Sequence, residues 1–354
     1  MKPGSLIAER YRIVRQLAEG GQAAVYLANQ EPLDRPVALK ILTPGMDASD
    51  QERMLFHNRF LREARALANF DHPNIVVIFD YGHIGDGAFY IAMEYVEGVR
   101  FNELLRAGPM APQRAAGLVT QVCDALRYAH EHKVIHRDIK HSNVLVRQRD
   151  GAEQVKVVDF GIAKMMEDET GLTLTGVVLG SAHFMAPEQA RGSGLTPLVD
   201  VYAVGVLLYC SLTGRYPFDG DSFHKIIFSH LGQEIPPFSE INPAVSIDPY
   251  LEAIVRRCLA KEPKQRFADV AALIEALEPY LTEGYATLAP DDATAEHLPP
   301  GAVAMTVTTA ATVAAGRGGL PWWLLPLGIG LAAFVLTSVL LVIIAAIVIF
   351  VMTG

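Results

Sequence analysis

The residues whose types and spacing could do chemistry lie in two short runs in the middle of the chain. The first is HRDIKHSN at 136–143, and VVDFG at 157–161 follows after a short apolar stretch. Either Asp138 or Asp159 alone could merely cap a turn. Phosphoryl transfer, however, needs this combination: hard oxygen ligands for Mg²⁺, a carboxylate near the acceptor hydroxyl, and positive charge around the moving phosphoryl group. In this order and spacing, the two runs predict a phosphoryl-transfer site.

A lysine at the end of an apolar run is a further candidate. Lys40 closes the run VALK at 37–40, and lysines avoid such places unless they are paired. Glu63, on a predicted amphipathic helix, is a candidate partner, although a solvated glutamate remains the alternative for any single Glu.

The small-residue turn LAEGGQAAV at 17–25 could bring backbone amides close to a phosphate, but a turn between strands needs small residues anyway.

The elements that must position these residues can be predicted from hydrophobic periodicity. Short β-rich runs separated by Gly, Pro and Asp predict an antiparallel sheet, with strands at 11–17, 24–29 and 36–42. An amphipathic helix is predicted at 51–69, and long helical patterns follow at 114–130, 199–212 and 251–259. A small strand-rich lobe therefore precedes a larger helical lobe.

Composition excludes several classes of protein. The 354 residues are 51% hydrophobic and 19% charged, which rules out wholesale disorder and collagen-like repeats. The formal charge of −9 argues against non-specific binding to nucleic acid, so no nucleic-acid partner is expected. The three cysteines lie far apart, without the spacing of a zinc site or redox pair. They indicate buried, reduced thiols.

The C-terminal part has a different character from the body of the chain. Residues 282–319 are rich in Ala, Thr, Pro and Gly and predict a tether. The apolar stretch 327–352 would form a helix of about 39 Å, enough to span a bilayer, whereas buried core helices are much shorter. Trp322 and Trp323 lie where an aromatic belt at the membrane interface is expected, and Arg317 favours a cytoplasmic N-terminal side. No secretory signal is expected at the N-terminus. A second span at 302–315 is disfavoured by its threonines and glycines.

Through these motifs, residues 11–281 resemble a eukaryotic-type (Hanks-type) protein kinase. The sequence APEQ at 186–189 and the single terminal span most resemble bacterial membrane-anchored serine/threonine kinases. The resemblance implies an α+β bilobal fold with a C-terminal transmembrane helix. It divides the chain into an N-lobe (1–95), a C-lobe (96–281), a linker (282–319) and a transmembrane region (320–352).

The resemblance also implies roles for individual residues. Lys40 would hold the α- and β-phosphates of ATP, with Glu63 as its ion-pair partner in the active arrangement. Asp138 would orient the acceptor hydroxyl as catalytic base, and Lys140 would contact the γ-phosphate. Asn143 and Asp159 would bind Mg²⁺, or Mn²⁺ in its place. Glu188 and Arg266 would form a buried ion pair, and Asp200 would brace the catalytic loop.

Nucleotide-binding residues follow from the same resemblance, with MEYV at 93–96 as gatekeeper and hinge. The implied set is Leu17, Ala18, Gly20, Gly21, Val25, Ala38, Lys40, Met93, Glu94, Val96 and Leu145. For the apolar members of this set, ordinary core packing is the alternative.

The resemblance also indicates candidate phosphorylation sites, and the sequence departs from the family pattern at several positions. Thr173 and Thr175 resemble autophosphorylation sites, and Arg137 could pair with the phosphate, although they could also be plain loop residues. Ala18 and Ala23 replace the first and third glycines of the glycine-rich loop and could weaken ATP binding. His141 stands where proline is usual, and Ser181 where threonine is usual.

The sequence thus predicts a membrane-tethered kinase that phosphorylates Ser or Thr of cytoplasmic proteins, with a homodimer as a further partnership. Lys140, two residues after Asp138, favours serine/threonine over tyrosine specificity. A nucleotide-binding pseudokinase scaffold at the membrane is the alternative suggested by the altered glycine-rich loop. A small-molecule phosphotransferase is disfavoured because the segment 173–188 resembles a peptide-acceptor platform.

Overall fold

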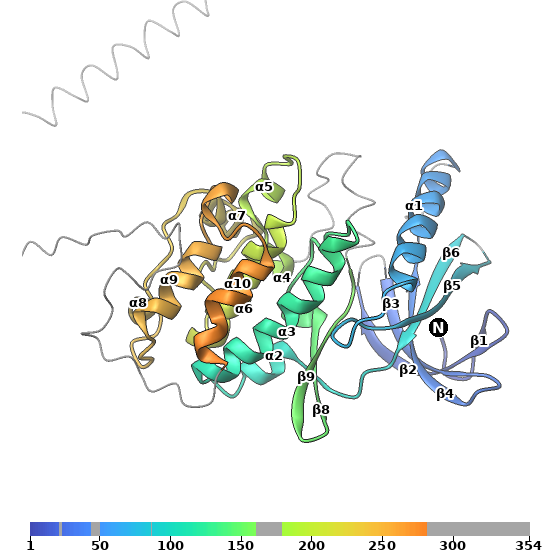
Figure 1. Cartoon of the computed structure of the whole chain (residues 1–354). Helices are drawn as coiled ribbons and strands as arrows, with labels where there is room; N and C mark the ends of the chain where they lie inside the picture. The colour runs from blue at the N-terminus through green and yellow to red at the C-terminus, as the bar shows by residue number, and fades with distance from the viewer. Residues whose placement is uncertain (21–22, 44–49, 86, 161–178, 282–354) are drawn as a thin grey trace, which may run out of the picture. The chain divides into compact units, whose positions relative to one another are not determined.

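The computed structural model describes residues 1–20, 23–43, 50–85, 87–160 and 179–281. They form a strand-rich N-terminal lobe followed by a mainly helical C-terminal lobe (Figure 1). The predicted bilobal α+β fold is therefore confirmed for this part of the chain. The predicted linker and transmembrane region, 282–319 and 320–352, lie outside the described residues. Within the described ranges, no helix has both the length and the apolar character that a membrane span requires.

The N-terminal lobe is built on one antiparallel sheet of order β1-β2-β3-β4-β6-β5. Its strands are β1 (Leu6–Ile7), β2 (Tyr11–Glu19), β3 (Ala23–Gln30), β4 (Arg35–Leu42), β5 (Ile78–Ile84) and β6 (Ala88–Glu94). The strands predicted at 11–17, 24–29 and 36–42 are found as β2, β3 and β4. The register places Lys40 opposite Val25 on β3 and opposite Ile91 on β6. Lys40 therefore lies on a central strand of the sheet.

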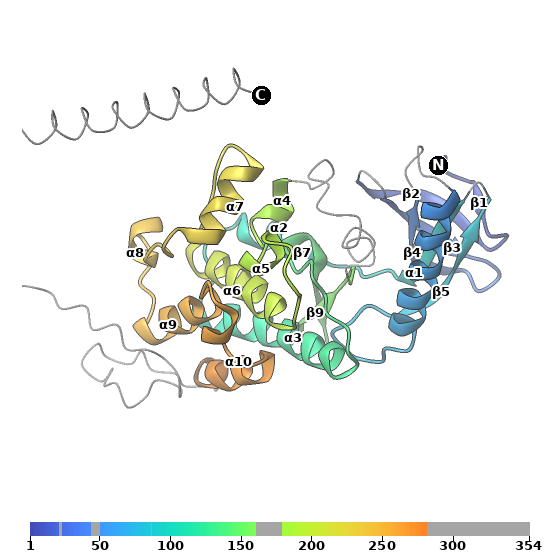
Figure 2. The ribbon, with the colours of Figure 1, turned by 90° about the horizontal axis from the view of Figure 1, so that it is seen from above.

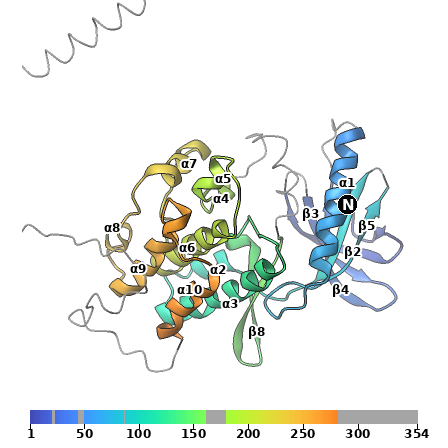
Figure 3. The ribbon, with the colours of Figure 1, turned by 45° about the horizontal axis from the view of Figure 1, so that its top comes forward.

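Helix α1 (Asp50–Ala68) packs against this sheet, as the views in Figures 2 and 3 show. Its apolar residues Phe60, Ala64 and Leu67 recur at three- and four-residue steps and are buried. The ring of Phe60 lies 4.8 Å from that of Phe89 on β6, centroid to centroid. Burial of this face, more than helix propensity, holds α1 on the sheet.

A second antiparallel sheet lies in the C-terminal lobe, with order β7-β8-β9. Its strands are β7 (Val99–Arg100), β8 (Val144–Arg149) and β9 (Ala152–Val157). The 3₁₀ helix η1 (His141–Asn143) leads directly into β8. The end of β9 is joined to the segment before β5, because Val157 N–H donates to Asn74 O and Val76 N–H donates to Val157 O, at 2.8 and 3.0 Å. The hairpin β8–β9 thus connects the catalytic loop with the region beneath the upper sheet.

The remaining elements of the described residues are helical. They are α2 (Phe101–Leu105), α3 (Pro112–Glu131), α4 (Leu179–Ala182), α5 (Pro187–Ala190), α6 (Leu198–Thr213), α7 (Phe223–Gly232), α8 (Phe238–Ile241), α9 (Pro249–Cys258), η3 (Pro263–Gln265), α10 (Val270–Leu277) and η4 (Glu278–Tyr280). The helices predicted at 114–130, 199–212 and 251–259 are found as α3, α6 and α9.

Helix α6 is the centre of the C-terminal lobe. Every residue from Val199 to Thr213 is buried, which explains why its sequence is apolar on all sides. It packs against α3 and α9 and ends at Gly214, whose φ of +71° is the left-handed geometry that glycine adopts without strain. The close approach to α9 occurs at Gly205, where an added Cβ would lie 2.5 Å from the Cβ of Cys258.

The contact at Gly205 gives a stability prediction. We expect Gly205→Ala to lower the free energy of unfolding by about 1–3 kcal/mol, because the methyl group would force α6 and α9 apart. The matched control is Gly117→Ala in α3, where no atom lies within 4 Å of the added Cβ. That control should be neutral or slightly stabilising. Urea unfolding of both variants tests the packing, and equal midpoints for the two would contradict it.

Candidate active site

A single buried carboxylate fixes the backbone of the catalytic loop. Asp200, in the first turn of α6, is completely buried. Its Oδ2 accepts a hydrogen bond from His136 N at 2.9 Å, and its Oδ1 accepts one from Arg137 N at 2.9 Å. Arg137 has a φ of +63°, which is unfavourable for a residue with a side chain. Asp200 therefore braces the loop, as predicted, and holds it in a conformation that the loop alone would not favour.

His136 adds a second restraint on the same loop. Its ring accepts from Asp138 N through Nδ1 at 3.3 Å and bonds to the carbonyl oxygen of Val158 through Nε2 at 3.1 Å. This pattern requires a neutral imidazole with its proton on Nε2. Burial lowers the pKa of His136, which favours that neutral form. The ring thus ties the loop carrying Asp138 to the segment carrying Asp159.

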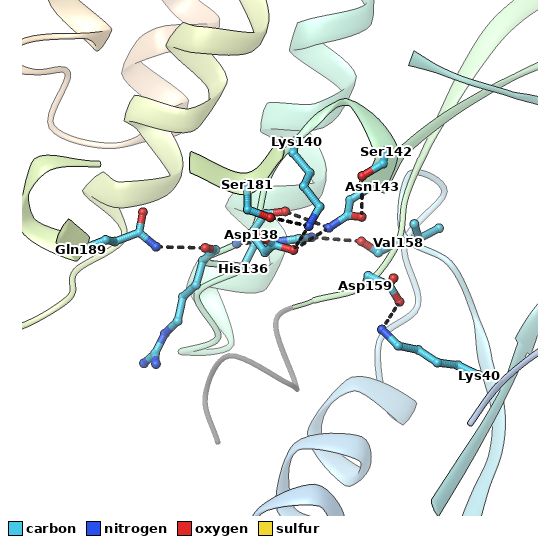
Figure 4. A network of polar contacts seen from close by, with 11 residues as sticks. Lys40, His136, Asp138, Lys140, Ser142, Asn143, Val158, Asp159, Ser181 and Gln189 are labelled. Atoms are coloured by element: carbon cyan, nitrogen blue, oxygen red, sulfur yellow. Dashed lines mark hydrogen bonds and ion pairs between the residues drawn. The ribbon is translucent and has the colours of Figure 1, made fainter. Parts of the chain in front are cut away.

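The polar side chains of the loop converge on one another (Figure 4). Lys140 Nζ donates to Asp138 Oδ2 at 2.6 Å and to Ser181 Oγ at 2.9 Å. Asn143 Nδ2 donates to the backbone oxygen of Asp138 at 2.9 Å and to its Oδ2 at 3.1 Å. The carboxylate of Asp138 is thereby held by a cation and an amide. Ser181, which stands where threonine is usual, retains the hydroxyl that this network uses.

Lys40 reaches across from the N-terminal lobe to Asp159. Its Nζ lies 2.7 Å from Asp159 Oδ1, and the lysine side chain is only 13% exposed. Asp159 has a φ of +58°, a second constrained backbone position at the site. Glu63 is instead bonded to Arg62, whose Nε lies 3.1 Å from Glu63 Oε1. Among the described residues no ion pair joins Lys40 to Glu63, so the structure does not contain the pair expected of the active arrangement.

The predicted nucleotide-binding residues lie on the strands that face the lobe boundary. Ala18 and Leu17 are on β2, Val25 on β3, Ala38 on β4, Met93 and Glu94 on β6, and Leu145 on β8, with Gly20 and Val96 just beyond β2 and β6. Gly20 N–H donates to Ala23 O at 2.8 Å and closes the turn between β2 and β3. Gly21 lies outside the described residues, as do Thr173 and Thr175.

A cavity lies next to the Lys40–Asp159 pair. Its lining combines these two side chains with apolar residues from both lobes: Leu42, Leu67, Ile75, Val76, Ile78, Ile91, Met93 and Phe160. Of the predicted nucleotide-binding set, Lys40 and Met93 belong to this lining. The other apolar residues were missed, because in sequence they are indistinguishable from ordinary core positions.

The oxygen-bearing side chains of the site fit a metal ion that binds together with a phosphate ligand. In the described ranges, no three His, Cys, Asp or Glu side chains gather as they would in a site made by the protein alone. Mg²⁺ is usually held by one or two protein oxygens plus substrate phosphates. Asp159 offers a carboxylate, and Asn143 keeps its Oδ1 as an acceptor because its Nδ2 is used by Asp138. These two residues could therefore hold such an ion.

Comparison with known proteins agrees with this geometry. The family model described as "Protein kinase domain" matches residues 11–277, which is most of the chain. The chain belongs to the protein kinase family. This family uses ATP and a divalent metal.

Several bacterial relatives of this kinase chain are named serine/threonine-protein kinases. PrkC of Bacillus subtilis is 44% identical over 265 residues, which cover 75% of this chain and 39% of the relative. A probable PknB of Lactococcus lactis is 41% identical over 273 residues, covering 77% of this chain and 42% of the relative. This chain thus spans about two fifths of their length. The crystal structure of the Mycobacterium tuberculosis PknI kinase domain matches with a TM-score of 0.60 and 26% identity, covering 79% of this chain and 99% of that one.

The kinase fold also shows how the unusual His141 is accommodated. Its ring is buried and lies parallel to that of Phe101 at 5.9 Å, with the ring of Phe184 edge-on at 4.7 Å. Burial and the nearby charge of His183 lower the pKa of His141 to about 3, so it is neutral at physiological pH. The histidine acts here as an aromatic core residue.

The predicted ion pair between Glu188 and Arg266 is present. The two side chains are almost fully buried and form two hydrogen bonds, of 2.7 Å to Oε1 and 2.8 Å to Oε2. The guanidinium also donates to the backbone oxygens of Leu198, Ala260 and Lys261, so its three remaining N–H groups are satisfied. This pair anchors α5 to the segment that follows η3.

Substitution of Asp200 tests whether this carboxylate braces the loop at His136 and Arg137. We expect Asp200→Asn to reduce the free energy of unfolding by roughly 2–3 kcal/mol and to impair activity, since the amide NH₂ would face a backbone N–H. The control is Asp124→Asn, which removes a partly exposed pair with Arg127 and should cost less than about 0.5 kcal/mol. Chemical denaturation measures both variants. If Asp200→Asn were as stable as the control variant, the bracing role would be excluded.

Proposed function

We propose that the chain transfers the γ-phosphoryl group of ATP to serine or threonine hydroxyls of proteins. The observation that carries the proposal is the convergence of Asp138, Lys140 and Asn143 near the Lys40–Asp159 pair (Figure 4). Phosphoryl transfer depends on positioning and charge stabilisation, and this set of groups supplies both. The names of the bacterial relatives support serine and threonine as acceptors.

Each group then has a role in that reaction. Asp138 orients the acceptor hydroxyl and receives its proton, while Lys140 balances the charge that develops beside it. Asn143 and Asp159 would hold Mg²⁺, or Mn²⁺, which would neutralise phosphate charge when bound. The backbone of the hinge, at Glu94 and Val96 after the gatekeeper Met93, would hold adenine between the apolar side chains of Leu17, Val25, Ala38 and Leu145. Ala18 and Gly20 would lie near the phosphates, and Gly21, which the same proposal includes, is outside the described residues.

Lys40 must exchange partners for this function. In the structure its amine contacts Asp159, whereas the active arrangement of a kinase pairs the lysine with the helix glutamate. A shift of α1 that releases Glu63 from Arg62 and brings it to Lys40 would free Asp159 for the metal. The pair Arg62–Glu63 opposes this shift only weakly, because the arginine side chain is 72% exposed.

Autophosphorylation at Thr173 or Thr175, which lie outside the described residues, provides the assay. We expect the wild-type chain, given labelled ATP and Mg²⁺, to incorporate label at Thr173 or Thr175. Asp138→Asn should reduce the rate by roughly 10²–10⁴-fold, because the acceptor hydroxyl loses its base. Lys40→Met should likewise abolish incorporation, because the α- and β-phosphates lose their cation.

The same assay separates a kinase from the alternative pseudokinase scaffold. Circular dichroism and urea unfolding establish that both variants are folded. If the wild-type chain binds ATP but transfers no label, it is a scaffold. If Lys40→Met retains the wild-type rate, the role given to Lys40 is wrong.

We also propose that the kinase domain lies in the cytoplasm and is tethered to the cell membrane through residues 320–352. The support is the uncharged apolar stretch 327–352, which is long enough to cross about 30 Å of hydrocarbon. Substrates would then be cytoplasmic proteins, and a homodimer formed within the membrane would bring two kinase domains together.

The tether can be tested with lipid vesicles. We expect the full chain to co-float with phospholipid vesicles and to resist extraction by high salt and alkaline carbonate, since its attachment is hydrophobic. A chain ending at residue 319 should remain at the bottom of the gradient. Recovery of the full chain in the soluble fraction would contradict the tether.

A further inference from the structure

A group of three charged side chains, one of them buried and two partly buried, joins the two lobes at the expected hinge. Glu94 ends β6 in the upper sheet, while Arg147 and Lys156 lie on β8 and β9 of the lower one. Lys156 Nζ lies 2.8 Å from Glu94 Oε2, and Arg147 Nη1 lies 3.0 Å from Glu94 Oε1. We refer to Glu94, Arg147 and Lys156 as the hinge triad.

The surroundings of the hinge triad make it stronger than a surface ion pair. The side chain of Lys156 is 5% exposed, and those of Glu94 and Arg147 are each 19% exposed. Lys156 also donates to the carbonyl oxygen of Ile75 at 3.0 Å. Burial opposes ionisation of Glu94, but the hydrogen bond and charge of Lys156, followed by the charge of Arg147, outweigh it and lower the pKa of Glu94. Removing one member therefore disturbs a contact that is largely shielded from solvent and held by direct hydrogen bonds and charge.

The strand register places the hinge triad against the expected adenine site. Lys156 on β9 is directly opposite Leu145 on β8, so the two side chains share one face of the hairpin. Leu145 is the residue expected beneath the adenine ring, and Glu94 is part of the hinge expected at its edge. Asp159 follows Lys156 by three residues. One lysine thus contacts the hinge directly and neighbours both the floor of the site and the metal-binding segment.

We propose that Lys156 is a positioning residue for the nucleotide: by holding the carboxylate of Glu94 it fixes the hinge backbone over Leu145. The inference rests on the proposed function, since it names a residue that sets the affinity of the same nucleotide site. Lys156 acts through Glu94 and does not touch the reacting groups. Its loss should weaken binding of ATP and leave the transfer step largely intact.

The variant Lys156→Met tests this role, because methionine keeps the length of the side chain and leaves Glu94 paired with Arg147. We expect the KM for ATP, and the Kd for ATP measured by calorimetry on the full chain, to rise about fivefold to tenfold. We expect kcat to stay within about twofold of the wild-type value. A purely structural role would lower the unfolding midpoint without this separation of KM from kcat.

The matched control is Arg114→Met. Arg114 forms two hydrogen bonds with Glu153, at 2.8 and 2.9 Å, and Glu153 lies on the same strand as Lys156. This ion pair joins α3 to β9 within the C-terminal lobe and does not reach the hinge, so the KM and Kd for ATP should not change. A Lys156→Met variant with the KM and Kd of the control would overturn the proposal, as would a loss confined to kcat.

Two further outcomes separate a failure of the proposed function from a failure of the role given to Lys156. If the wild-type chain binds ATP without transferring phosphate, the proposed function fails, but the Kd of Lys156→Met still tests the hinge triad. If Lys156→Met does not fold, Lys156→Gln replaces it, because glutamine removes the positive charge beside Glu94 and keeps a polar group in this buried position. That variant should raise the Kd for ATP by a smaller factor, and an unchanged Kd would overturn the proposal.

Discussion

The buried carboxylate of Asp200 is the interaction on which the candidate site depends. It accepts hydrogen bonds from two successive backbone amides, His136 N and Arg137 N, and so fixes the chain just before Asp138. Hydrogen bonds to a charged acceptor that is shielded from solvent are stronger than bonds between neutral groups, and their loss is costly. Because phosphoryl transfer relies on placement more than on covalent chemistry, this restraint is a direct requirement of the proposed reaction. The fully buried helix α6 supplies the rigid support for it.

The two lobes contribute to the candidate active site in different ways. In the C-terminal lobe the polar groups are bonded to one another through Asp138, Lys140 and Asn143, so their arrangement is already determined. The N-terminal lobe contributes Lys40, whose carboxylate partner in the structure is Asp159 rather than Glu63. In the proposed reaction, a shift of α1 relative to the sheet would bring Glu63 to Lys40. The hinge triad joins β6 to β8 and β9, and in the proposal it keeps the adenine contacts in place.

Part of the fold was predictable from the sequence pattern. Short β-rich runs identified β2, β3 and β4, three- and four-residue spacing identified α1, and long helical patterns identified α3, α6 and α9. The candidate site residues were singled out in two ways: Lys40 because a lysine in an apolar strand needs a partner, and Asp138, Asn143 and Asp159 because of their combination and spacing. The roles proposed for them come from the family resemblance. The reasoning used for Lys40 also applies to Lys156, which stands between Val155 and Val157 in an apolar strand and could have been singled out in the same way.

Two features could not be derived from sequence. The choice of Asp159 over Glu63 as the partner of Lys40 depends on where α1 lies, and both carboxylates are chemically equivalent candidates. The cavity beside Lys40 is lined by residues such as Leu67 and Ile91, whose types fit core packing equally well. In both cases the deciding quantity is a distance between segments far apart in the chain, which periodicity does not encode.

The measurement that tests the central claim most directly is a crystal structure of the chain with Mg²⁺ and a non-hydrolysable ATP analogue. We predict one metal–triphosphate contacted by Lys40, Asn143 and Asp159, with Asp138 facing the terminal phosphate. Lys40 should then have left the carboxylate of Asp159 and be paired with Glu63. A triphosphate bound away from these side chains, or a metal held by other residues, would contradict the account.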